Sequence, residues 1–287
     1  MKRALAMCAV AAVLLCAVAQ ADTITHGGTT IDMDFVTISH AGNSADTTGF
    51  GAVSNGYRIA QYEVTADQWT SVIAADANVG NAGGYWTGSQ PTAGATWYEA
   101  AKFCNWLTSG DAYGGAYQFT GDTLTGVDRA AAVATYGTVY VLPTEDEWYK
   151  AAYYKADGSG YTFFPTGDTE PDAGITGENW YVSGAAWNVG SGIAENNGTY
   201  DMGGNLWEWT ESPWDGTLDD MAEKRELRGG HFDDYTSAYM DSAHRVKSDP
   251  WNEDDWIIGF RVASIPEPAT LGLLGLGGLA MLRRRRQ

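Results

Sequence analysis

The sequence predicts a single domain of mixed α and β structure in which much of the backbone is irregular. The chain has 36 Gly, 12 Trp and 16 Tyr in 287 residues, a composition typical of a loop-rich body held together by large rings. Three threonine-led capping boxes each predict the start of a helix. Short runs rich in β-branched and aromatic residues fit strands between and around these helices.

Both ends of the chain carry targeting signals. Lys2-Arg3, an apolar run over 4–19 and the tripeptide Ala19-Gln20-Ala21 are typical of a secretory signal peptide that is cleaved after Ala21. At the other end, Pro266-Glu267-Pro268 precedes an apolar, glycine-rich run over 271–282 and four arginines at 283–286. This apolar run is shorter than the roughly twenty residues of a stable membrane span.

The C-terminal pattern resembles the PEP-CTERM sorting signal of Gram-negative bacteria. The resemblance implies transient insertion of a C-terminal membrane helix, handling by an exosortase-type enzyme, and delivery to the cell surface, outer membrane or extracellular matrix. An ordinary weak anchor is the alternative. We therefore predict a signal peptide over 1–21, a globular domain over 22–264 and a sorting signal over 265–287.

The globular part is strongly acidic. Without the six basic residues of the two signals, 11 of the 17 Lys and Arg remain, against 36 Asp and Glu in the whole chain. Such a surface repels nucleic acid and anionic lipid, and it suits solubility or divalent cations. Cys104 is the single cysteine beyond the signal peptide, so the exported chain cannot form an internal disulfide.

The elements follow from local patterns. Strands are expected over 34–38 and 57–62. The capping boxes at Thr65, Thr96 and Thr144 predict helices that run to about 74, to about 108 before Gly110, and through 148–152. The second helix is expected to bury one face, formed by Trp97, Ala100, Ala101, Cys104 and Leu107. The segment 156–197 shows no regular pattern, and its length suggests that a metal ion or aromatic packing orders it.

The stretch 198–210 reads as a glycine-turned loop that feeds one buried strand. Gly203 and Gly204 allow positive φ, and Leu206, Trp207 and Trp209 supply apolar area for the strand. Asp201 and Glu208 present hard oxygen atoms that could converge on one cation. The alternative is a turn that carries two solvated acids.

Six motifs in order resemble the formylglycine-generating enzyme, or sulfatase-modifying factor, family. They are Tyr62-Glu63-Val64-Thr65, Ala95 to Ala100, Leu142 to Trp148, Tyr200 to Thr210, Arg228-Gly229-Gly230 and Gly259-Phe260-Arg261. The match covers nearly the whole globular domain, although Val141 stands where family members often carry arginine. The resemblance implies an irregular α+β fold of C-type-lectin-like kind.

The same resemblance implies structural calcium. One family site maps to the side chains of Asp201 and Glu208 and the carbonyls of Gly204 and Leu206. A second site would begin at Asn179 and the carbonyl of Trp180, but no matching acid follows in the sequence.

Catalysis is where the chain departs from the family. Family enzymes use a copper ion held by two cysteines, with a serine just before them. Here the serine position falls on His231, and the cysteine positions fall on Asp234 and Tyr239. Carboxylate and phenol oxygens are poor replacements for the soft thiolates that copper(I) prefers, so copper is not expected.

Two interpretations of this region stay open. His231, Asp233, Asp234, Asp241 and His244 could hold iron or zinc in a divergent oxidoreductase, or they could decorate the rim of a loop. We expect Arg228, Arg245 and Arg261 to make internal charge-assisted hydrogen bonds. If the protein is an enzyme, His231, Asp234 and His244 should face a shared pocket.

The sequence as a whole favours an exported, surface-sorted module that binds a ligand without catalysis. Its ligand is expected to be extracellular polysaccharide or another surface protein. Two or three rings of a set in glycine-rich or acidic loops are expected to be exposed for this purpose, namely Trp86, Trp180, Trp187, Tyr235, Tyr239 and Trp251. A passive matrix component is a third possibility, and it predicts no deep pocket.

Overall fold

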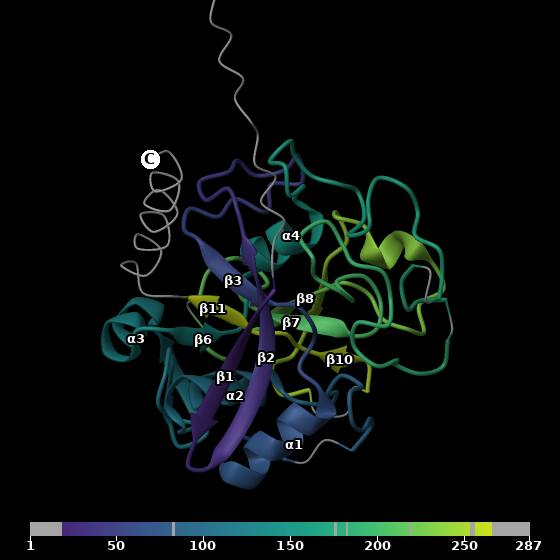
Figure 1. The fold of residues 1–287 in the computed structure, drawn as a ribbon. Coiled ribbons are helices and arrows are strands. Elements are labelled where there is room, and N and C mark those ends of the chain that lie inside the picture. Colours follow the sequence, from purple (N-terminus) through teal and green to yellow (C-terminus); the bar gives the residue numbers. More distant parts are fainter. Residues whose placement is uncertain are drawn as a thin grey trace, which may run out of the picture.

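The computed structural model describes residues 19–81, 84–174, 177–181, 183–218, 220–252 and 256–265. Most of the predicted signal peptide and nearly all of the predicted sorting signal lie outside these residues. Figure 1 shows two sheets near the centre of the domain, with helices and long loops around them. None of the helices in the described ranges has the length and apolar character needed to cross a membrane.

One antiparallel sheet joins the two ends of the domain. Its described strands lie in the order β1, β2, β3, β11 and β6, with the bounds Gln20–His26, Thr29–Ile38, Tyr57–Ala60, Ala263–Ile265 and Val139–Val141. The expected strands over 34–38 and 57–62 fall on β2 and β3. The β1–β2 hairpin was not predicted, and it turns at Gly27 and Gly28, which both have positive φ.

The first residues of β1 lie at the predicted cleavage site. Asp22, the predicted first residue after cleavage, binds Arg58 through two hydrogen bonds of 2.6 and 2.7 Å. It also accepts a hydrogen bond of 3.0 Å from the hydroxyl of Tyr140. The ion pair therefore ties β1 to β3, so the residue that follows the predicted cleavage site is fixed to the sheet.

A second sheet contains the strand that was predicted within residues 198–210. The strand β7 (Trp207–Pro213) pairs with β8 (Arg225–Arg228) and with the short strand β10 (Ile258–Gly259), and β8 pairs with β9 (Val246–Ser248). The predicted strand after Leu206 is therefore confirmed, and its first four residues are all buried. A separate hairpin is formed by β4 (Tyr117–Thr120) and β5 (Thr123–Val127).

The three predicted helices are present with their capping boxes. They are α1 (Ala66–Ala75), α2 (Trp97–Ser109) and α4 (Glu145–Tyr153), capped by Thr65, Thr96 and Thr144. Gly110 ends α2 in the left-handed region, with φ of 83°. Two helical elements were not predicted: α3 (Arg129–Tyr136), which is short and capped by Asp128, and a 3₁₀ turn over Ser237–Met240.

Helix α2 is buried on more than one face. The five residues of its predicted apolar face are buried, and so are Lys102 and Asn105. The Asn105 amide donates to the carbonyls of Ala112 and Tyr117, at 2.9 and 2.8 Å, and thereby fixes the chain that leads into β4. Cys104 is fully buried in this core, and burial raises the pKa of its thiol well above the usual range. It is a core residue, as predicted.

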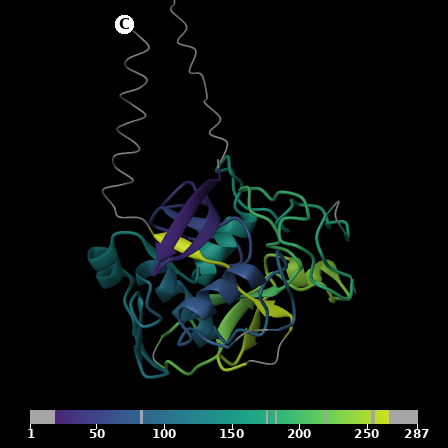
Figure 2. The same ribbon diagram turned by 60° about the horizontal axis from the view of Figure 1, so that its bottom comes forward.

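The long segment between α4 and β7 forms no helix or extended strand in its described residues, as predicted. In Figures 1 and 2 it lies on the side of the domain opposite α3. Asn197 anchors it by donating to the carbonyls of Ala151 and Tyr154, at 3.0 and 2.6 Å. A side-chain amide that binds backbone carbonyls therefore fixes this part of the segment to the end of α4.

Candidate functional site

The loop before β7 is shaped by three residues in the left-handed region. Asp201, Gly204 and Asn205 have φ of 61°, 78° and 59°. A side chain at Gly204 would meet the carbonyl oxygen of Asn179 at 2.3 Å, so glycine is required there. Gly203 does not have positive φ, and the prediction was wrong for that residue. The loop is folded back against Asn179 from the irregular segment.

Glu208 is held by a buried arginine. The Arg261 Nε atom lies 2.7 Å from Oε2 of Glu208, and the Trp148 indole donates to the same oxygen at 2.7 Å. Arg261 also donates to the carbonyl of Tyr200 at 2.9 Å. The side chains of Arg261, Glu208 and Trp148 are all buried. The negative charge of Glu208 is thus balanced by a guanidinium 53 residues later in the chain. This confirms the predicted role of Arg261.

Asp201 is also bound by the protein itself. Its Oδ1 accepts a hydrogen bond of 2.8 Å from the Trp187 indole, and its Oδ2 accepts one of 2.6 Å from the amide of Gly190. In this arrangement both carboxylates of the predicted calcium set already have donors. The ligand set of Asp201, Gly204, Leu206 and Glu208 stays a prediction, and its side chains fit calcium poorly because of these donors.

The residues predicted for a second calcium site organise the irregular segment. The Asn179 side chain donates to Ala185 and Asn205, at 3.2 and 3.0 Å, and accepts from the Ser183 hydroxyl at 2.8 Å. Trp180 follows it and is half-buried. The second site also stays a prediction. The Asn179 amide that would bind calcium there is already engaged by these protein groups.

Glu63 binds the loop before β7, a contact that its sequence motif did not reveal. It is buried, and its Oε2 accepts a hydrogen bond of 2.5 Å from the Asn205 amide. Its Oε1 accepts from the amide of Leu206 at 3.2 Å. Glu63 therefore connects the end of β3 to the loop that enters β7.

Two further buried acids lie beside this network and were missed by sequence reasoning. Glu178 is 0 % exposed, and neither of its carboxylate oxygens has a hydrogen-bond partner among the described residues. Glu195 is 5 % exposed, and its Oε1 accepts a hydrogen bond of 2.6 Å from the amide of Met202. Acid residues in a loop are normally solvated, so no sequence signal marked this pair.

The loop that carries the family's active-site positions gathers around Trp207. The His231 Nε2 atom lies 3.1 Å from Asp234 Oδ1, and the other oxygen of Asp234 accepts from the His231 amide at 2.7 Å. The rings of Tyr239 and His244 are 4.8 Å apart, and each packs against Trp207. The structure thus brings His231 and Asp234 together as a pair, with Tyr239 and His244 as a second pair.

Neither pair makes a recognisable metal centre. Among the described residues, no group of three or more His, Cys, Asp or Glu side chains has an arrangement that could hold a metal ion. Asp241 caps a turn by accepting from the amide of Ala243 at 2.8 Å. Burial lowers the pKa of His244, which favours its neutral form at physiological pH.

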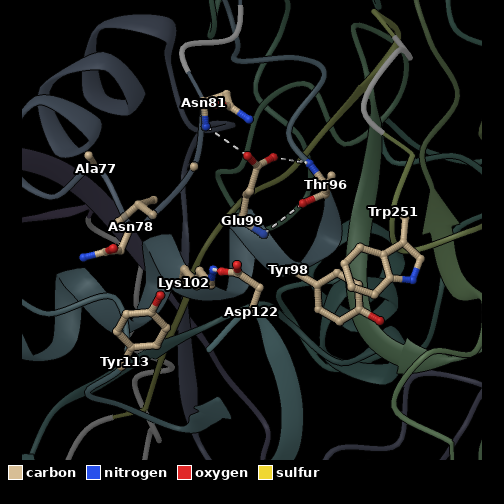
Figure 3. Close-up of a pocket in the computed structure, with 12 residues that line it drawn as sticks. Ala77, Asn78, Asn81, Thr96, Tyr98, Glu99, Lys102, Tyr113, Asp122 and Trp251 are labelled. Carbon is tan, nitrogen blue, oxygen red and sulfur yellow. Dashed lines mark hydrogen bonds and ion pairs between the residues drawn. The ribbon is translucent and has the colours of Figure 1, made fainter. Parts of the chain in front are cut away.

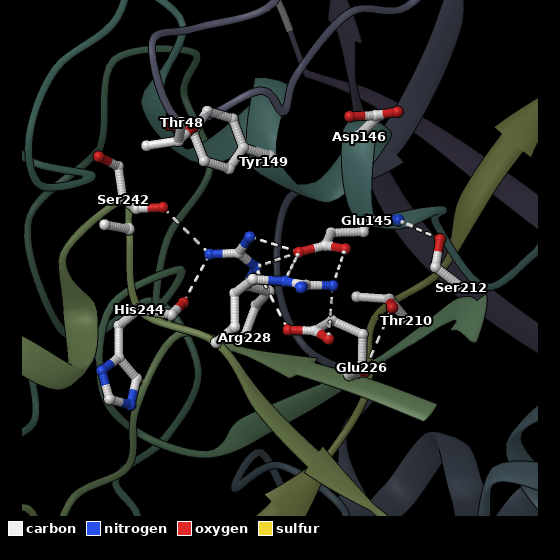
Figure 4. Close-up of polar contacts among 12 residues, drawn as sticks. Thr48, Glu145, Asp146, Tyr149, Thr210, Ser212, Glu226, Arg228, Ser242 and His244 are labelled. Atoms are coloured by element: carbon white, nitrogen blue, oxygen red, sulfur yellow. Dashed lines mark hydrogen bonds and ion pairs between the residues drawn. The ribbon is translucent and has the colours of Figure 1, made fainter. Parts of the chain in front are cut away.

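Two arginines, Arg228 and Arg245, hold the same loop against α4. Figure 4 shows the Arg228 guanidinium between Glu145 and the carbonyls of Ser242 and His244. Arg245 binds the same glutamate at 2.7 Å and also pairs with Glu226 at 3.0 Å. These contacts confirm the internal charge-assisted bonds predicted for Arg228 and Arg245. They tie the loop after β8 to the first turn of α4.

A separate pocket of about 460 Å³ lies at the start of α2. At one end the exposed ring of Trp251 packs on Tyr98 with centroids 4.2 Å apart. At the other end Lys102 pairs with Asp122 at 2.6 Å and lies 5.3 Å from the ring of Tyr113. Figure 3 shows these groups facing the same space. The pocket shares none of its lining residues with the His231 loop.

Two of the six loop aromatics named from the sequence are exposed. Tyr235 is 76 % exposed and Trp251 is 55 % exposed, within the expected two or three. Trp86, Trp180, Trp187 and Tyr239 are half-buried. Trp251 differs from Tyr235 because it also lines the pocket.

Comparisons with known families give matches to both the globular domain and the C-terminal segment. The model of the sulfatase-modifying factor enzyme 1-like domain matches residues 24–265, and that of the PEP-CTERM protein-sorting motif matches residues 264–286. "Chaperone protein LppX" of Paenibacillus barcinonensis is 26% identical over 220 residues, which are 66% of this chain and 76% of that protein. "Inactive C-alpha-formylglycine-generating enzyme 2" of Mus musculus is 31% identical over 143 residues, which are 43% of this chain and 42% of that protein.

Solved structures share the fold. "Treponema denticola variable protein 1" superposes with a TM-score of 0.61 at 22% identity, covering 86% of this chain and 99% of its own. The structure of CarF superposes with a TM-score of 0.62 at 22% identity, covering 80% and 97%. Together with the family match, these likenesses confirm the predicted single-domain, irregular α+β fold.

Proposed function

Because the chain belongs to the sulfatase-modifying factor enzyme 1-like family and carries a PEP-CTERM sorting motif, we propose that it is a surface-sorted, non-catalytic module that binds an extracellular polysaccharide. The PEP-CTERM motif implies exosortase-mediated sorting to the cell surface. The observation that carries the proposal of binding is the pocket between Trp251 and Lys102, which combines an exposed ring platform with polar groups.

The residues at the family's copper positions support a role without the family's oxidation chemistry. Copper(I) binds thiolates, whereas Asp234 offers a carboxylate that is already bound to His231, and Tyr239 offers a phenol. Cys104 cannot replace a missing thiolate, because it is fully buried in α2. Relatives of the chain include inactive formylglycine-generating enzymes.

The chemistry of the pocket favours a sugar ligand. A sugar ring presents a flat C–H face that packs on an exposed indole, and its hydroxyls take hydrogen bonds from charged and amide groups at the edge. Trp251 supplies the ring, while Asn78, Lys102 and Asp122 supply polar groups in the same pocket. The formal net charge of −19 repels polyanions, so the expected ligand is a neutral or amino-sugar polysaccharide.

Binding assays with two matched aromatic variants test this proposal. We expect the protein to be retarded in affinity electrophoresis by a neutral or amino-sugar polysaccharide and not by a uronic acid polymer. Trp251→Ala should weaken binding about fivefold, because a ring contact contributes roughly 1 kcal/mol. Tyr235→Ala is the control, since Tyr235 is more exposed but lies outside the pocket. Equal binding by both variants, or no polysaccharide binding at all, would contradict the proposal.

A divergent oxidoreductase is the second candidate. It is favoured by one observation, the gathering of His231, Asp234, Tyr239 and His244 around Trp207. This candidate requires a transition metal bound at these side chains. Copurification of copper, iron or zinc that is lost on His231→Ala or His244→Ala would support it against the binding module.

A further inference from the structure

The pocket at the start of α2 has an exposed aromatic ring at each of its two ends. Trp251 packs on Tyr98 with ring centroids 4.2 Å apart, and it remains 55 % exposed. Tyr113 lies shortly after the end of α2 and is 37 % exposed. Both rings line the same pocket, and Figure 3 shows them on opposite sides of the Lys102–Asp122 pair. The pocket therefore offers two separate surfaces on which a flat apolar face can stack.

Contacts with the two ends of α2 hold both rings in place. The amide of the first residue of α2 donates to the carbonyl of Pro250 at 3.1 Å, which fixes the loop that carries Trp251. Beyond the other end of the helix, the Asn105 side chain donates to the carbonyl of Ala112 at 2.9 Å, next to Tyr113. A ring that the fold already holds loses little conformational freedom when a ligand stacks on it. The two surfaces are therefore preformed at a fixed separation.

The separation of the rings sets the size of the ligand. Tyr98, on which Trp251 packs, and Lys102 are four residues apart on α2, a rise of about 6 Å along the helix. The Lys102 ammonium lies a further 5.3 Å from the ring of Tyr113. A single sugar ring therefore cannot stack on Trp251 and Tyr113 at the same time, whereas a chain of sugars can.

The polar groups between the rings favour uncharged hydroxyls. Lys102 donates to Oδ1 of Asp122 at 2.6 Å, so these two charges balance each other. The two oxygens of Glu99 accept from the backbone amides of Asn81 and Thr96, each at 2.9 Å. Among the described residues, Oδ2 of Asp122 has no hydrogen-bond donor. Two neighbouring sugar hydroxyls match this arrangement, because one can donate to Asp122 while the other accepts from Lys102.

We propose that this pocket binds the interior of a linear, uncharged oligosaccharide, with one sugar stacked on Trp251, another on Tyr113, and hydroxyls between them bound by Lys102 and Asp122. The inference rests on the proposed function, the binding of a polysaccharide, and it specifies which part of the polymer is recognised. Each ring contributes its own stacking contact. Affinity should therefore rise with chain length until both rings are covered.

Chain length tests the inference on the full protein. Isothermal titration calorimetry measures the binding of β-1,4-linked oligomers of glucose and of N-acetylglucosamine, and affinity electrophoresis with hydroxyethyl cellulose and glycol chitin is run in parallel. We expect each monosaccharide to bind at least about fivefold more weakly than its hexasaccharide, because it reaches only one ring. If a monosaccharide binds as tightly as its hexasaccharide, or a polymer retards the protein while none of its oligomers binds, the inference is wrong and the proposed function stands. If neither polymers nor oligomers bind, both are wrong.

Variants of the two rings locate the sugars. Trp251→Ala and Tyr113→Ala should each weaken hexasaccharide binding about fivefold, and the double variant should bind more weakly than either. Tyr235→Ala, which removes an exposed ring outside the pocket, should bind like the wild type. Asp122→Asn should weaken binding without a change in melting temperature, because the Asp122 side chain is 84 % exposed. Loss of affinity in Trp251→Ala with none in Tyr113→Ala would show a single stacking surface and overturn the inference.

Discussion

Replacement of Arg261 tests how much its buried ion pair with Glu208 stabilises the domain. Arg261 is fully buried, and it binds Glu208 while donating to the carbonyls of Ala60 and Tyr200. Arg261→Met would leave the Glu208 carboxylate buried with the Trp148 indole as its remaining donor. Breaking a buried pair in this way costs about 3 to 5 kcal/mol. In a domain of this size the loss corresponds to a melting temperature lowered by roughly 6 to 20 °C.

The double variant makes the test specific. Urea denaturation of Arg261→Met should show the loss, and addition of Glu208→Gln should restore part of it. The reason is that glutamine removes the unpaired charge but keeps an acceptor for the Trp148 indole. A single variant that loses less than about 1 kcal/mol, or a double variant that is no more stable than the single one, would show that Arg261 does not stabilise the domain by neutralising Glu208.

Three smaller predictions follow from other parts of the fold. Thr96→Ala should lower stability to urea by about 1 kcal/mol, because it removes the cap of α2, whereas Thr135→Ala on the exposed side of α3 should cost less than about 0.5 kcal/mol. Cys104 should resist alkylation in the folded protein and react fully in denaturant, since burial raises the pKa of its thiol; modification of the native state would contradict its place in the core. Burial and the charge of Glu145 raise the pKa of Glu226 to about 8. Its contribution to stability is therefore complete below its unfolded pKa of about 4.3 and is lost as pH rises toward 8. Stability measured across that range should fall with pH in the wild type and fall less in Glu226→Gln; parallel curves would show that Glu226 is ionised throughout.

Features encoded in neighbouring residues could be predicted from the sequence. The capping boxes at Thr65, Thr96 and Thr144 start the three predicted helices because their bonds join residues three apart. The apolar spacing of α2 likewise placed Cys104 in the core. The β1–β2 hairpin was not predicted, and its first strand begins at Gln20, before the predicted end of the signal peptide at Ala21.

The buried ion pairs join residues that are far apart in the chain, so the spacing of residues in the sequence does not reveal them. Arg261 was expected to make internal bonds, and the structure shows that its partner is Glu208, a member of the predicted calcium set. Glu178 and Glu195 looked like ordinary loop acids, and only the fold shows that they are buried together. The residues at the family's cysteine positions were identified from the motifs alone. Their pairing, Asp234 with His231 and Tyr239 with His244, required the structure.

The most direct measurement for the central claim is an assay for cysteine oxidation by the purified protein. The protein is incubated with a cysteine-containing peptide, copper, a thiol reductant and oxygen, and the peptide is analysed for formylglycine by mass spectrometry. A variant with Asp234→Cys and Tyr239→Cys provides a matched comparison. We predict no formylglycine with the wild-type protein, because Asp234 and Tyr239 offer no thiolates to copper. Formylglycine that depends on wild-type protein and disappears with His231→Ala would show that the module is an enzyme.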